Sequence, residues 1–390
     1  VNTNDEWYNF IWKSDFMYRK TYVEIDCNRL ENNIKEIKEK YNDYKYYIGV
    51  VKANCYGHGI ESIKYLIKGG INYLAVSSLE EALNIRKIDK NISILILEPI
   101  HNEDVTIASD NNITITIDNK ESFKYLINNK IKIKFHIKVD TGMNRFGLKN
   151  KTDIKYIYDN SNKDVYLEGI FTQLAVGFGN EFIKSKEKFL ELTSLIDINK
   201  IEIVHLERSL TLEQHNRLEF GNGIRLGIIM YGFNNKGYTP SLKRRIFNKL
   251  TFKKTNNTKS ILNLNTVLKF YSEIIEIKDI SKDEIVGYGS MYDNKENIKI
   301  GIIPYGFADY LFINKSYVVV NGKKYNIVVN YMDATAIIID DNVKLYDKVE
   351  IFGDSISIRE ASRLAGVNVY KTLCSITRRV PRIYKYNDKK

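Results

Sequence analysis

The sequence predicts an α/β protein that consists of a (β/α)8 TIM-like barrel followed by a mostly antiparallel β domain. Between about residues 45 and 230, eight short β-branched runs alternate with stretches of helical length, several of them with a spacing near 3.6. After about residue 233 the pattern changes to many strands and few helices. A doubly wound open sheet is the alternative for the first part, but such sheets usually have fewer strands in a row.

The eight candidate strands of the barrel are short apolar runs separated by amphipathic segments. Leu30, Ile34 and Ile37 have helical spacing, and so do Phe182, Phe189 and Leu192 with Leu195–Ile196. The candidate strands are Tyr46–Ala53, Asn72–Ser77, Ile92–Glu98, Ile113–Asp118, Lys132–Asp140, Tyr166–Gln173, Ile201–Glu207 and Ile224–Met230.

The second half begins after a polar stretch over 234–263 that has no strong periodicity. Asn321-Gly322 is a hairpin signal between two strands. Ser357–Ala365 is expected to be one short helix. The candidate strands are Val267–Ile277, Ile298–Ile303, Tyr317–Val320, Tyr325–Asn330, Ala334–Ile339 and Val349–Phe352.

The length of 390 residues suits two domains. We expect the barrel over 18–235 and the β domain over 260–390, with an N-terminal extension over 1–17 and a linker or insertion over 236–259. No apolar run approaches the ~18 residues of a membrane helix, and no secretory signal is visible, so no membrane contact is expected from this chain itself. Because the chain opens at Val1, the question whether a targeting or membrane segment precedes it stays open. We expect a cytoplasmic protein or the cytosol-facing domain of a longer one.

The net charge of +11 raises the question of a nucleic-acid partner. Lysine, asparagine, isoleucine and tyrosine are abundant throughout, which indicates compositional bias, and the one basic cluster, Lys243–Lys254, lies in a polar stretch that reads as a solvated loop. We therefore expect no nucleic-acid binding. The three cysteines, Cys27, Cys55 and Cys374, are odd in number and widely spaced, so they form neither a disulfide framework nor a metal-ligand pattern. This suits a reducing compartment and predicts no metal.

The carboxyl ends of barrel strands are where catalytic groups gather, and the first candidate strand leads directly into Lys52. A lysine that follows an apolar strand is partly desolvated, which lowers the pKa of its amine and makes it a competent Schiff-base nucleophile. A lone lysine in this place is more often an ordinary solvated side chain. The surrounding sequence decides between these two interpretations.

The string Lys52–Gly59 closely resembles the cofactor-lysine motif of alanine racemases, with Cys55 where small residues are usual. Further segments resemble the family in the same order along the chain, from residue 22 to residue 382. They are Tyr22–Asp26 with Leu30–Asn33, Lys138–Gly147, Phe171–Gln173, His205–Ser209, Arg225–Ile228, Gly287–Tyr292, Ile303–Asp309, Met332–Asp333 and Tyr370–Arg382. An ordered set of this length is far more specific than one motif.

The resemblance implies pyridoxal 5′-phosphate (PLP) as cofactor, bound as a Schiff base on Lys52. Arg225 would donate to the ring nitrogen and discourage its protonation, with His205 supporting Arg225. The phosphate contacts would come from Tyr56, Ser209, Tyr370 and the backbone amides of Gly227 and Ile228, and barrel phosphate sites do favour the loops after strands seven and eight.

The resemblance also implies a racemase that interconverts L- and D-alanine, an isomerase that supplies D-alanine for the bacterial cell wall. Lys52 would exchange the Cα proton on one face of the substrate and Tyr288 on the other. Arg145 and Met332 would contact the small amino-acid substrate. In the family the tyrosine comes from the partner subunit, so the resemblance implies a homodimer with shared active sites, and Met332 would cross in the same way.

Several positions depart from the family pattern. Gln173 stands where the family has a histidine, Arg208 replaces an asparagine, and Tyr331 replaces a smaller residue. The stretch over 234–263 is also longer than the usual linker. Lys138 matches a lysine that is carbamylated in some members, and the resemblance leaves its carbamylation open.

These departures leave other activities open. A serine or serine/alanine racemase, including the type whose catalytic domain follows a membrane portion, is the nearest alternative. A related PLP decarboxylase for basic amino acids is disfavoured by the racemase-type motifs at Tyr288 and Met332–Asp333. A PLP-binding protein without racemase activity is kept open by Gln173, although the β domain with Tyr288 argues against it.

Overall fold

Eight parallel strands close into a barrel in the computed structural model of this chain, which describes residues 18–234, 260–289, 292–310 and 316–387. The expected extension over 1–17, the expected linker over 236–259 with the basic cluster Lys243–Lys254, and Ser290-Met291 of the tyrosine motif lie outside the described residues. By their contacts, the described residues among 28–55 and 60–266 form one compact unit, and those among 18–27, 56–59 and 267–390 form the other.

The barrel strands pair in two parallel groups that join at both ends. The first group has the order β4-β3-β2-β10-β9 and the second the order β5-β6-β7-β8. A parallel bridge between Leu95 and Thr114 joins β4 to β5, and β8 continues through Leu206 into β9. Counting β8 and β9 as one interrupted strand gives the eight positions of the barrel. The strands are β2 (Tyr46–Val50), β3 (Tyr73–Val76), β4 (Ile94–Ile96), β5 (Ile115–Ile117), β6 (Ile133–Val139), β7 (Val165–Thr172), β8 (Ile203–His205), β9 (Glu207–Arg208) and β10 (Gly223–Leu226). The predicted barrel is therefore confirmed.

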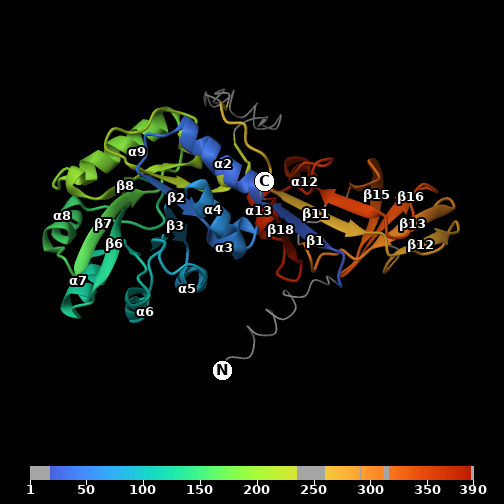
Figure 1. Cartoon of the computed structure of the whole chain (residues 1–390), viewed down its shortest axis with the longest axis horizontal. Coiled ribbons are helices and arrows are strands. Elements are labelled where there is room, and N and C mark those ends of the chain that lie inside the picture. Colours follow the sequence, from blue (N-terminus) through green and yellow to red (C-terminus); the bar gives the residue numbers. More distant parts are fainter. Residues whose placement is uncertain (1–17, 235–259, 290–291, 311–315, 388–390) are drawn as a thin grey trace. The chain divides into compact units, whose positions relative to one another are not determined.

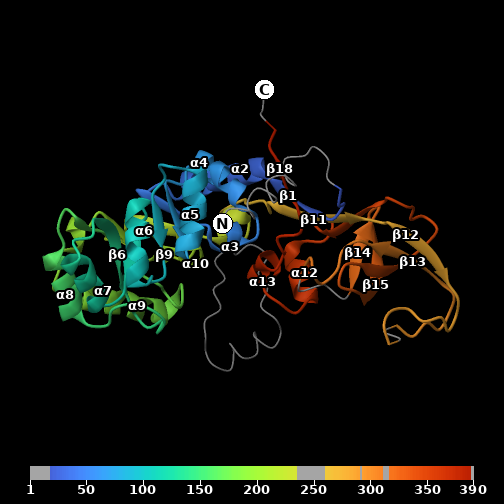
Figure 2. The ribbon, with the colours of Figure 1, turned by 90° about the horizontal axis from the view of Figure 1, so that it is seen from below.

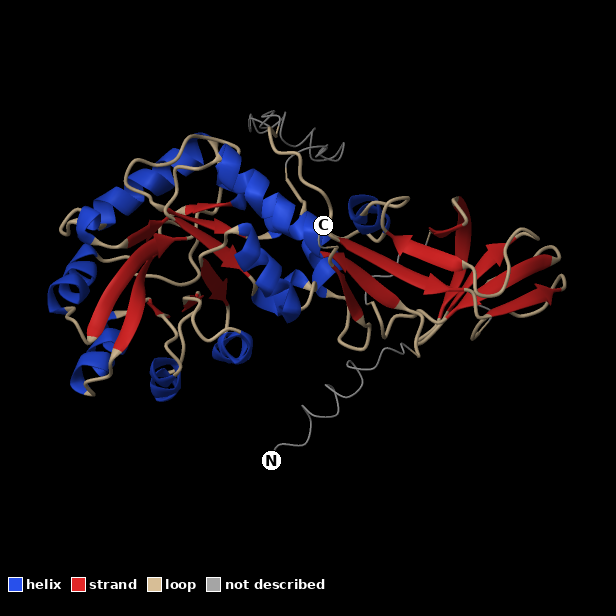
Figure 3. Ribbon diagram, viewed as in Figure 1, coloured by secondary structure: helices blue, strands red, loops and turns tan. Residues whose placement is uncertain are grey.

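Helices follow the strands, and the longer ones lie on the outside of the barrel (Figures 1 and 3). They are α2 (Cys27–Lys40), α4 (Ile63–Gly69), α5 (Leu79–Ile88), α6 (Val105–Asp110), α7 (Lys120–Asn128), α8 (Lys151–Asn160) and α9 (Gly179–Leu192). Two short segments, α3 (Lys52–Tyr56) and α10 (Ser209–Leu212), follow the carboxyl ends of β2 and β9. Ser78 and Asn119 cap α5 and α7 by accepting hydrogen bonds from backbone amides of the first turn. Leu30, Ile34 and Ile37 of α2 are fully buried, as their spacing predicts.

Three expected boundaries in this unit differ from the structure. The strand expected over Ile224–Met230 ends at Leu226, and Ile228–Tyr231 forms a 3-10 turn. The strand expected over Ile201–Glu207 is interrupted at Leu206. Helix α9 ends at Leu192, so Leu195 lies beyond it and its side chain is exposed.

The other unit is built on a nine-stranded sheet of mostly antiparallel strands in the order β12-β13-β16-β15-β14-β17-β11-β1-β18. The strands are β1 (Tyr22–Asp26), β11 (Leu268–Glu273), β12 (Glu276–Ile280), β13 (Ile298–Ile303), β14 (Tyr317–Val320), β15 (Lys323–Asn330), β16 (Thr335–Ile339), β17 (Lys348–Phe352) and β18 (Arg382–Lys385). The antiparallel β domain is thus confirmed. Phe270, Phe352, Tyr305 and Tyr310 are buried together in its core and meet edge to face.

The hairpin signal is confirmed, because Asn321 and Gly322 both have positive φ and connect β14 to β15 with Val320 opposite Lys323. The strand expected over Val267–Ile277 is divided into β11 and β12. The helix expected over Ser357–Ala365 is confirmed as α12 (Ile358–Leu364). A second helix, α13 (Val369–Cys374), lies beside it (Figure 2), with the Ser362 and Thr372 hydroxyl oxygens 2.7 Å apart.

Strand β1 (Tyr22–Asp26) belongs to this sheet and not to the barrel. It pairs antiparallel with β11 and parallel with β18. The expected barrel boundary at residue 18 therefore differs from the compact unit, which contains residues up to Cys27. Within the described residues, no helix is both long and apolar enough to cross a lipid bilayer.

Candidate active site

Most of the barrel residues that the sequence singles out lie at the carboxyl ends of the strands. Lys52 follows β2 by two residues, His205 ends β8, and Arg225 is the third residue of β10. Parallel strands of a barrel end at the same edge, so these side chains lie at one end of the barrel. Arg225 pairs with Ile48 of β2, the strand that leads into Lys52.

The backbone after Lys52 forms one left-handed turn. Ala53, Asn54, Cys55 and Tyr56 have φ values of 54°, 52°, 55° and 52°. Left-handed backbone costs L-residues roughly 1–2 kcal/mol each, and consecutive residues rarely adopt it. Strain of this kind concentrates at functional sites, where the surrounding structure must hold it. The turn therefore marks the Lys52 loop as a site independently of its sequence motif.

Glu81 of α5 holds the beginning of this turn. Its carboxylate accepts from the amide of Ala53 at 2.6 Å and from the amide of Ser77 at 2.9 Å. Cys55, the departure from the family pattern, is buried, and burial raises the pKa of its thiol to about 12. Cys55 is thus a neutral packing residue, while the amine of Lys52 donates to none of the residues that the structure describes.

Arg225 is held in the barrel interior by its two Nη atoms. Nη1 lies 2.8 Å from Nδ1 of His205 and also donates to the His205 carbonyl, and Nη2 donates to the carbonyl of Thr172 at 2.7 Å and to that of Leu206 at 3.3 Å. Four of the five guanidinium N–H groups are thereby used. The remaining one, on Nε, meets no acceptor among the described residues, which is the donor that a ring nitrogen would need.

Lys138 of β6 is a buried amine near two arginines. Its Nζ donates to the carbonyl of Leu97 at 3.0 Å and lies 5.0 Å and 5.4 Å from the ring centres of Phe146 and Phe171. Burial first, and then the charges of Arg145 and Arg225, lower the pKa of Lys138 to about 8. Arg145 itself is exposed in the loop after β6.

The lowered pKa makes Lys138 a cost to folding at neutral pH. Its protonated form is disfavoured in the folded state, so the cost is absent above the unfolded pKa of ~10.4, grows as the pH falls and is complete below about 8. Lys138→Met is therefore expected to raise the free energy of unfolding by about 2 kcal/mol at pH 6, and by much less at pH 10. Urea unfolding in CO2-free buffer at both pH values measures this, with the exposed Lys151→Met as the control. Equal effects at the two pH values would contradict the burial argument.

Two short helical segments begin next to each other where the phosphate is expected. Ser209 starts α10, Gly227 precedes the turn Ile228–Tyr231, and the amide of Gly227 donates to the Ser209 hydroxyl at 2.8 Å. The amide of Ile228 has no acceptor within the described ranges. Because Ser209 accepts from Gly227, its own hydroxyl proton is left to donate outward. Clustered donors of this kind suit an anion.

The two departures at this end of the barrel have different surroundings. Gln173 directly follows β7 and is partly exposed. Arg208 directs its guanidinium to the loop after β7, where it donates to the carbonyls of Leu174 at 3.1 Å and Ala175 at 3.4 Å. The additional charge of Arg208 is therefore tied to that loop, although it still contributes to lowering the pKa of the buried Arg225, after burial itself.

The remaining predicted residues belong to the unit with the antiparallel sheet. The rings of Tyr56 and Tyr370 pack with centroids 5.9 Å apart, so the structure brings together the two tyrosines expected at the phosphate. Tyr288 lies between Gly287 and Gly289, both with positive φ, and 82% of its surface is exposed. Its ring meets that of Tyr331 edge to face at 6.0 Å.

Met332 is presented by a loop that a second loop holds in place. The amides of Phe307 and Ala308 donate to the carbonyls of Tyr331 and Met332 at 3.0 and 2.9 Å. A Cβ atom at Gly306 would lie 2.3 Å from the Met332 carbonyl oxygen, so the close approach requires glycine. The Met332 side chain is exposed, as are those of Tyr288 and Phe307 beside it.

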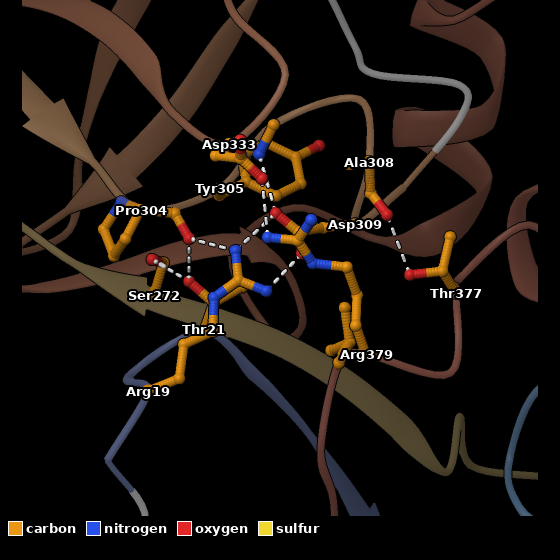
Figure 4. Close-up of polar contacts among 12 residues, drawn as sticks. Arg19, Thr21, Ser272, Pro304, Tyr305, Ala308, Asp309, Asp333, Thr377 and Arg379 are labelled. Carbon is orange, nitrogen blue, oxygen red and sulfur yellow. Dashed lines mark hydrogen bonds and ion pairs between the residues drawn. The ribbon is translucent and has the colours of Figure 1, made fainter.

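A buried carboxylate clamped by two arginines fixes these loops (Figure 4). Asp309 is fully buried and pairs with Arg19 and with Arg379, whose Nη2 also reaches Asp333 at 2.7 Å. Arg19 further donates to the carbonyl of Pro304 at 3.0 Å. Two cations offset the burial of one carboxylate here, and the clamp ties the segment before Met332 to the segment after it.

Sequence reasoning singled out neither the arginine clamp nor two buried residues inside the barrel, His136 and Glu168. The signal that was present for His136 is its place in the alternation Lys134, His136, Lys138 along one face of β6. Arg19 and Arg379 carry no local signal, because each depends on a partner about 70 or 290 residues away.

Comparisons with known proteins agree with one another. The sequence model described as alanine racemase, N-terminal domain, matches residues 25–235, and the one described as alanine racemase, C-terminal domain, matches residues 267–384. The alanine racemase of Staphylococcus saprophyticus is 32% identical over 389 residues, covering 95% of this chain and 96% of that protein. The alanine racemase of Borreliella burgdorferi is 32% identical over 381 residues, covering 94% and 97%.

Solved structures show the same likeness. Alanine racemase from Bacillus anthracis with bound L-Ala-P has a TM-score of 0.83 at 29% identity and covers 95% of this chain and 96% of that one. Alanine racemase from E. faecalis has a TM-score of 0.83 at 26% identity and covers 94% and 99%. A histidine racemase from Leuconostoc mesenteroides, with a TM-score of 0.80 at 22% identity and coverage of 96% and 100%, shares the fold.

Proposed function

This chain belongs to the alanine racemase family, and on that premise we propose that it interconverts L- and D-alanine with PLP as cofactor, using Lys52 and Tyr288 as its two proton-transfer groups. The observation that carries the proposal is the combined match of both family domains with the site at the carboxyl ends of the barrel strands. The enzyme is accordingly an isomerase. We include in the proposal a cytosol-facing location and D-alanine supply for the cell wall.

The residues present fit PLP. Arg225 has one unused buried N–H group, Ser209 with the amides of Gly227 and Ile228 offers donors to a phosphate, and Lys52 has an amine without a partner in the described part of the chain. Tyr56 and Tyr370 would complete the phosphate contacts. When bound, the cofactor acidifies the Cα proton of an amino acid and delocalises the charge that forms there.

The chain's own groups then determine which reaction follows. Arg225 stays protonated at neutral pH although burial, with Arg208 next, lowers its pKa to about 9, so it donates to the ring nitrogen and opposes protonation there. This restricts the outcome to proton exchange at Cα. Nζ of Lys52 takes or returns the proton on one face and Oη of Tyr288 on the other.

Arg145 would bind the substrate carboxylate, as a guanidinium suits a planar anion. A carbamate on Lys138 would give Arg145 a buried acceptor, and the amine of Lys138, with a pKa of about 8, has the neutral fraction that carbamylation requires. Met332 would contact the substrate from the β domain. Gln173 cannot titrate as a histidine would, so it contributes hydrogen bonds only.

We propose a homodimer in which Tyr288 and Met332 serve the partner's site. Tyr288, Met332 and Phe307 are all exposed, Tyr288 packs against Tyr331, and the Tyr331 carbonyl accepts from the Phe307 amide, so we propose that these side chains contribute to one apolar patch. Exposed apolar patches mark interaction surfaces. The arginine clamp on Asp309 would keep this patch rigid.

Racemisation of L-alanine, L-serine and L-histidine by the PLP-loaded chain tests the function. We expect inversion of alanine with the highest kcat/KM, because Tyr331 adds bulk where the family has a smaller residue. Chiral chromatography of quenched reactions measures both enantiomers directly. If PLP binds with its characteristic absorbance but alanine is not inverted, the assignment is overturned. Preferential inversion of serine or histidine would change the assigned substrate to that amino acid.

A further inference from the structure

A column of buried polar side chains fills the barrel interior behind Arg225. Nδ1 of His205 lies 2.8 Å from Arg225, Nε2 of His205 lies 2.8 Å from Nδ1 of His136, and Nε2 of His136 lies 3.1 Å from Glu168. All four side chains are buried. Barrel interiors are mostly filled by branched apolar residues, so a continuous polar column has a cost that its function must offset.

The contacts permit only one arrangement of protons. A guanidinium donates and cannot accept, so Nδ1 of His205 must accept from Arg225. A neutral His205 then carries its proton on Nε2 and donates it to Nδ1 of His136. His136 in turn carries its proton on Nε2 and donates to the carboxylate of Glu168. Burial, followed by the charge of Arg225 and by His136, lowers the pKa of His205 well below its usual value, which agrees with a neutral ring.

Glu168 is suited to end this column as an acceptor. Besides His136, it accepts from Tyr73 at 2.6 Å, Thr114 at 3.1 Å and Lys134 at 2.8 Å. Burial alone would raise the pKa of this carboxyl, but the hydrogen bonds from His136, Lys134 and Tyr73 outweigh burial and hold the pKa below its usual range. Glu168 is therefore ionised and orients every donor around it.

Two local features of β7 make room for the column. The register between β6 and β7 shifts so that Phe135 pairs with Leu167 and His136 with Gly169, which leaves Glu168 as a bulged residue. A Cβ atom at Gly169 would lie 2.5 Å from Cε1 of His136. The bulge redirects the Glu168 side chain, and the glycine admits the imidazole ring beside it.

We propose that His136 and Glu168 are positioning residues that lock His205 in its Nε2–H tautomer, so that His205 holds the Nη atoms of Arg225 and leaves its Nε–H for the cofactor ring nitrogen. The inference rests on the proposed function in so far as Arg225 is the ring partner. With the tautomer of His205 reversed, its Nδ1–H would face the guanidinium donors of Arg225 and displace them.

Glu168→Gln is the variant that is expected to reverse the direction of the hydrogen bonds along the column. The amide oxygen is expected to stay with the ammonium of Lys134, and the amide N–H then faces Nε2 of His136, which must become an acceptor. The proton of His136 moves to Nδ1 and that of His205 is driven toward Arg225. Glu202→Gln is the matched control, because Glu202 is an exposed carboxylate that contacts only Tyr46 and Tyr166 in the described part of the chain.

The test combines ring-nitrogen NMR of the full PLP-loaded chain, which has only five histidines, with racemisation kinetics. We expect neutral Nε2–H rings at His136 and His205 in wild type, the opposite tautomer at His136 in Glu168→Gln, and a kcat/KM for alanine lowered about tenfold or more, as for other outer partners of a functional histidine. Glu202→Gln should match wild type in both readouts.

Two results would overturn the inference. One is a wild type in which His205 is charged or carries its proton on Nδ1, and this measurement does not require the variant to fold. The other is a Glu168→Gln variant with wild-type kcat/KM and a reversed His136 tautomer. If the wild type has the expected tautomers but inverts no amino acid, the proposed function fails while the proton arrangement is supported, so the two failures are distinguishable.

Discussion

Lys52→Ala is expected to abolish racemisation, with a loss in kcat/KM for L-alanine of about 10⁴-fold or more, since one residue supplies both the covalent attachment and one proton-transfer group. The cofactor should still bind weakly through the donors at Ser209 and Gly227, without the absorbance of the lysine-linked form. Equilibrium binding and stopped-assay chiral chromatography measure the two effects separately.

A rescue experiment makes this prediction sharper. Alanine at position 52 leaves space for a small amine, so added methylamine is expected to restore part of the turnover in Lys52→Ala and to leave wild type unchanged. Lys64→Ala, on the exposed face of α4, is the matched control and should behave as wild type. Turnover in Lys52→Ala near the wild-type level would exclude Lys52 from the chemistry.

Tyr288→Phe is the second large effect, with an expected loss of inversion of about 10²–10⁴-fold, the usual contribution of one general acid–base group. Only one face of the substrate loses its proton-transfer group. In D2O, the enantiomer whose Cα proton faces Lys52 should still exchange that proton without inverting, while the other enantiomer should do neither. NMR of both enantiomers, with the exposed Tyr346→Phe as control, measures this.

Exchange lost equally for both enantiomers would contradict the assignment of Tyr288 to a single face. It would show instead that the phenol contributes to both proton transfers or to binding. The phenylalanine keeps the ring packing against Tyr331, so a change in folding is not expected to confuse the result.

Mixing the two inactive variants tests the shared site. If Tyr288 serves the partner's Lys52, a heterodimer of Lys52→Ala and Tyr288→Phe contains one site with both residues intact and one with neither. Random exchange of subunits should then restore about a quarter of the wild-type activity, since half of the dimers are mixed and half of their sites are intact. No recovery on mixing would mean that both residues act within one subunit.

Local sequence determined the elements whose stability is local. The alternation of apolar runs with amphipathic segments predicted eight barrel strands, because a strand buried on both faces must be apolar throughout. Asn321-Gly322 predicted its hairpin because both residues tolerate positive φ. The lysine at the end of the first barrel strand was also identifiable from local sequence, because its position depends only on where one apolar run ends.

Tertiary structure decided what depends on partners distant in the chain. Strand β1 joins the antiparallel sheet because β11 and β18 pair with it, and nothing in Tyr22–Asp26 records those partners. Asp309 is an ordinary aspartate until Arg19 and Arg379 meet it.

The polar column in the barrel is the strongest case. Its residues come from separate strands, each of which is consistent with many neighbours. Only the bulge at Glu168, the space at Gly169 and the closing of β10 against β2 bring Glu168, His136 and His205 into one line with Arg225. The sequence by itself determined the proposed cofactor lysine, the strands and the family. Hydrogen bonding between distant strands decided how Arg225 is held, because which ring nitrogen of each histidine carries the proton depends on all of its hydrogen-bond partners together.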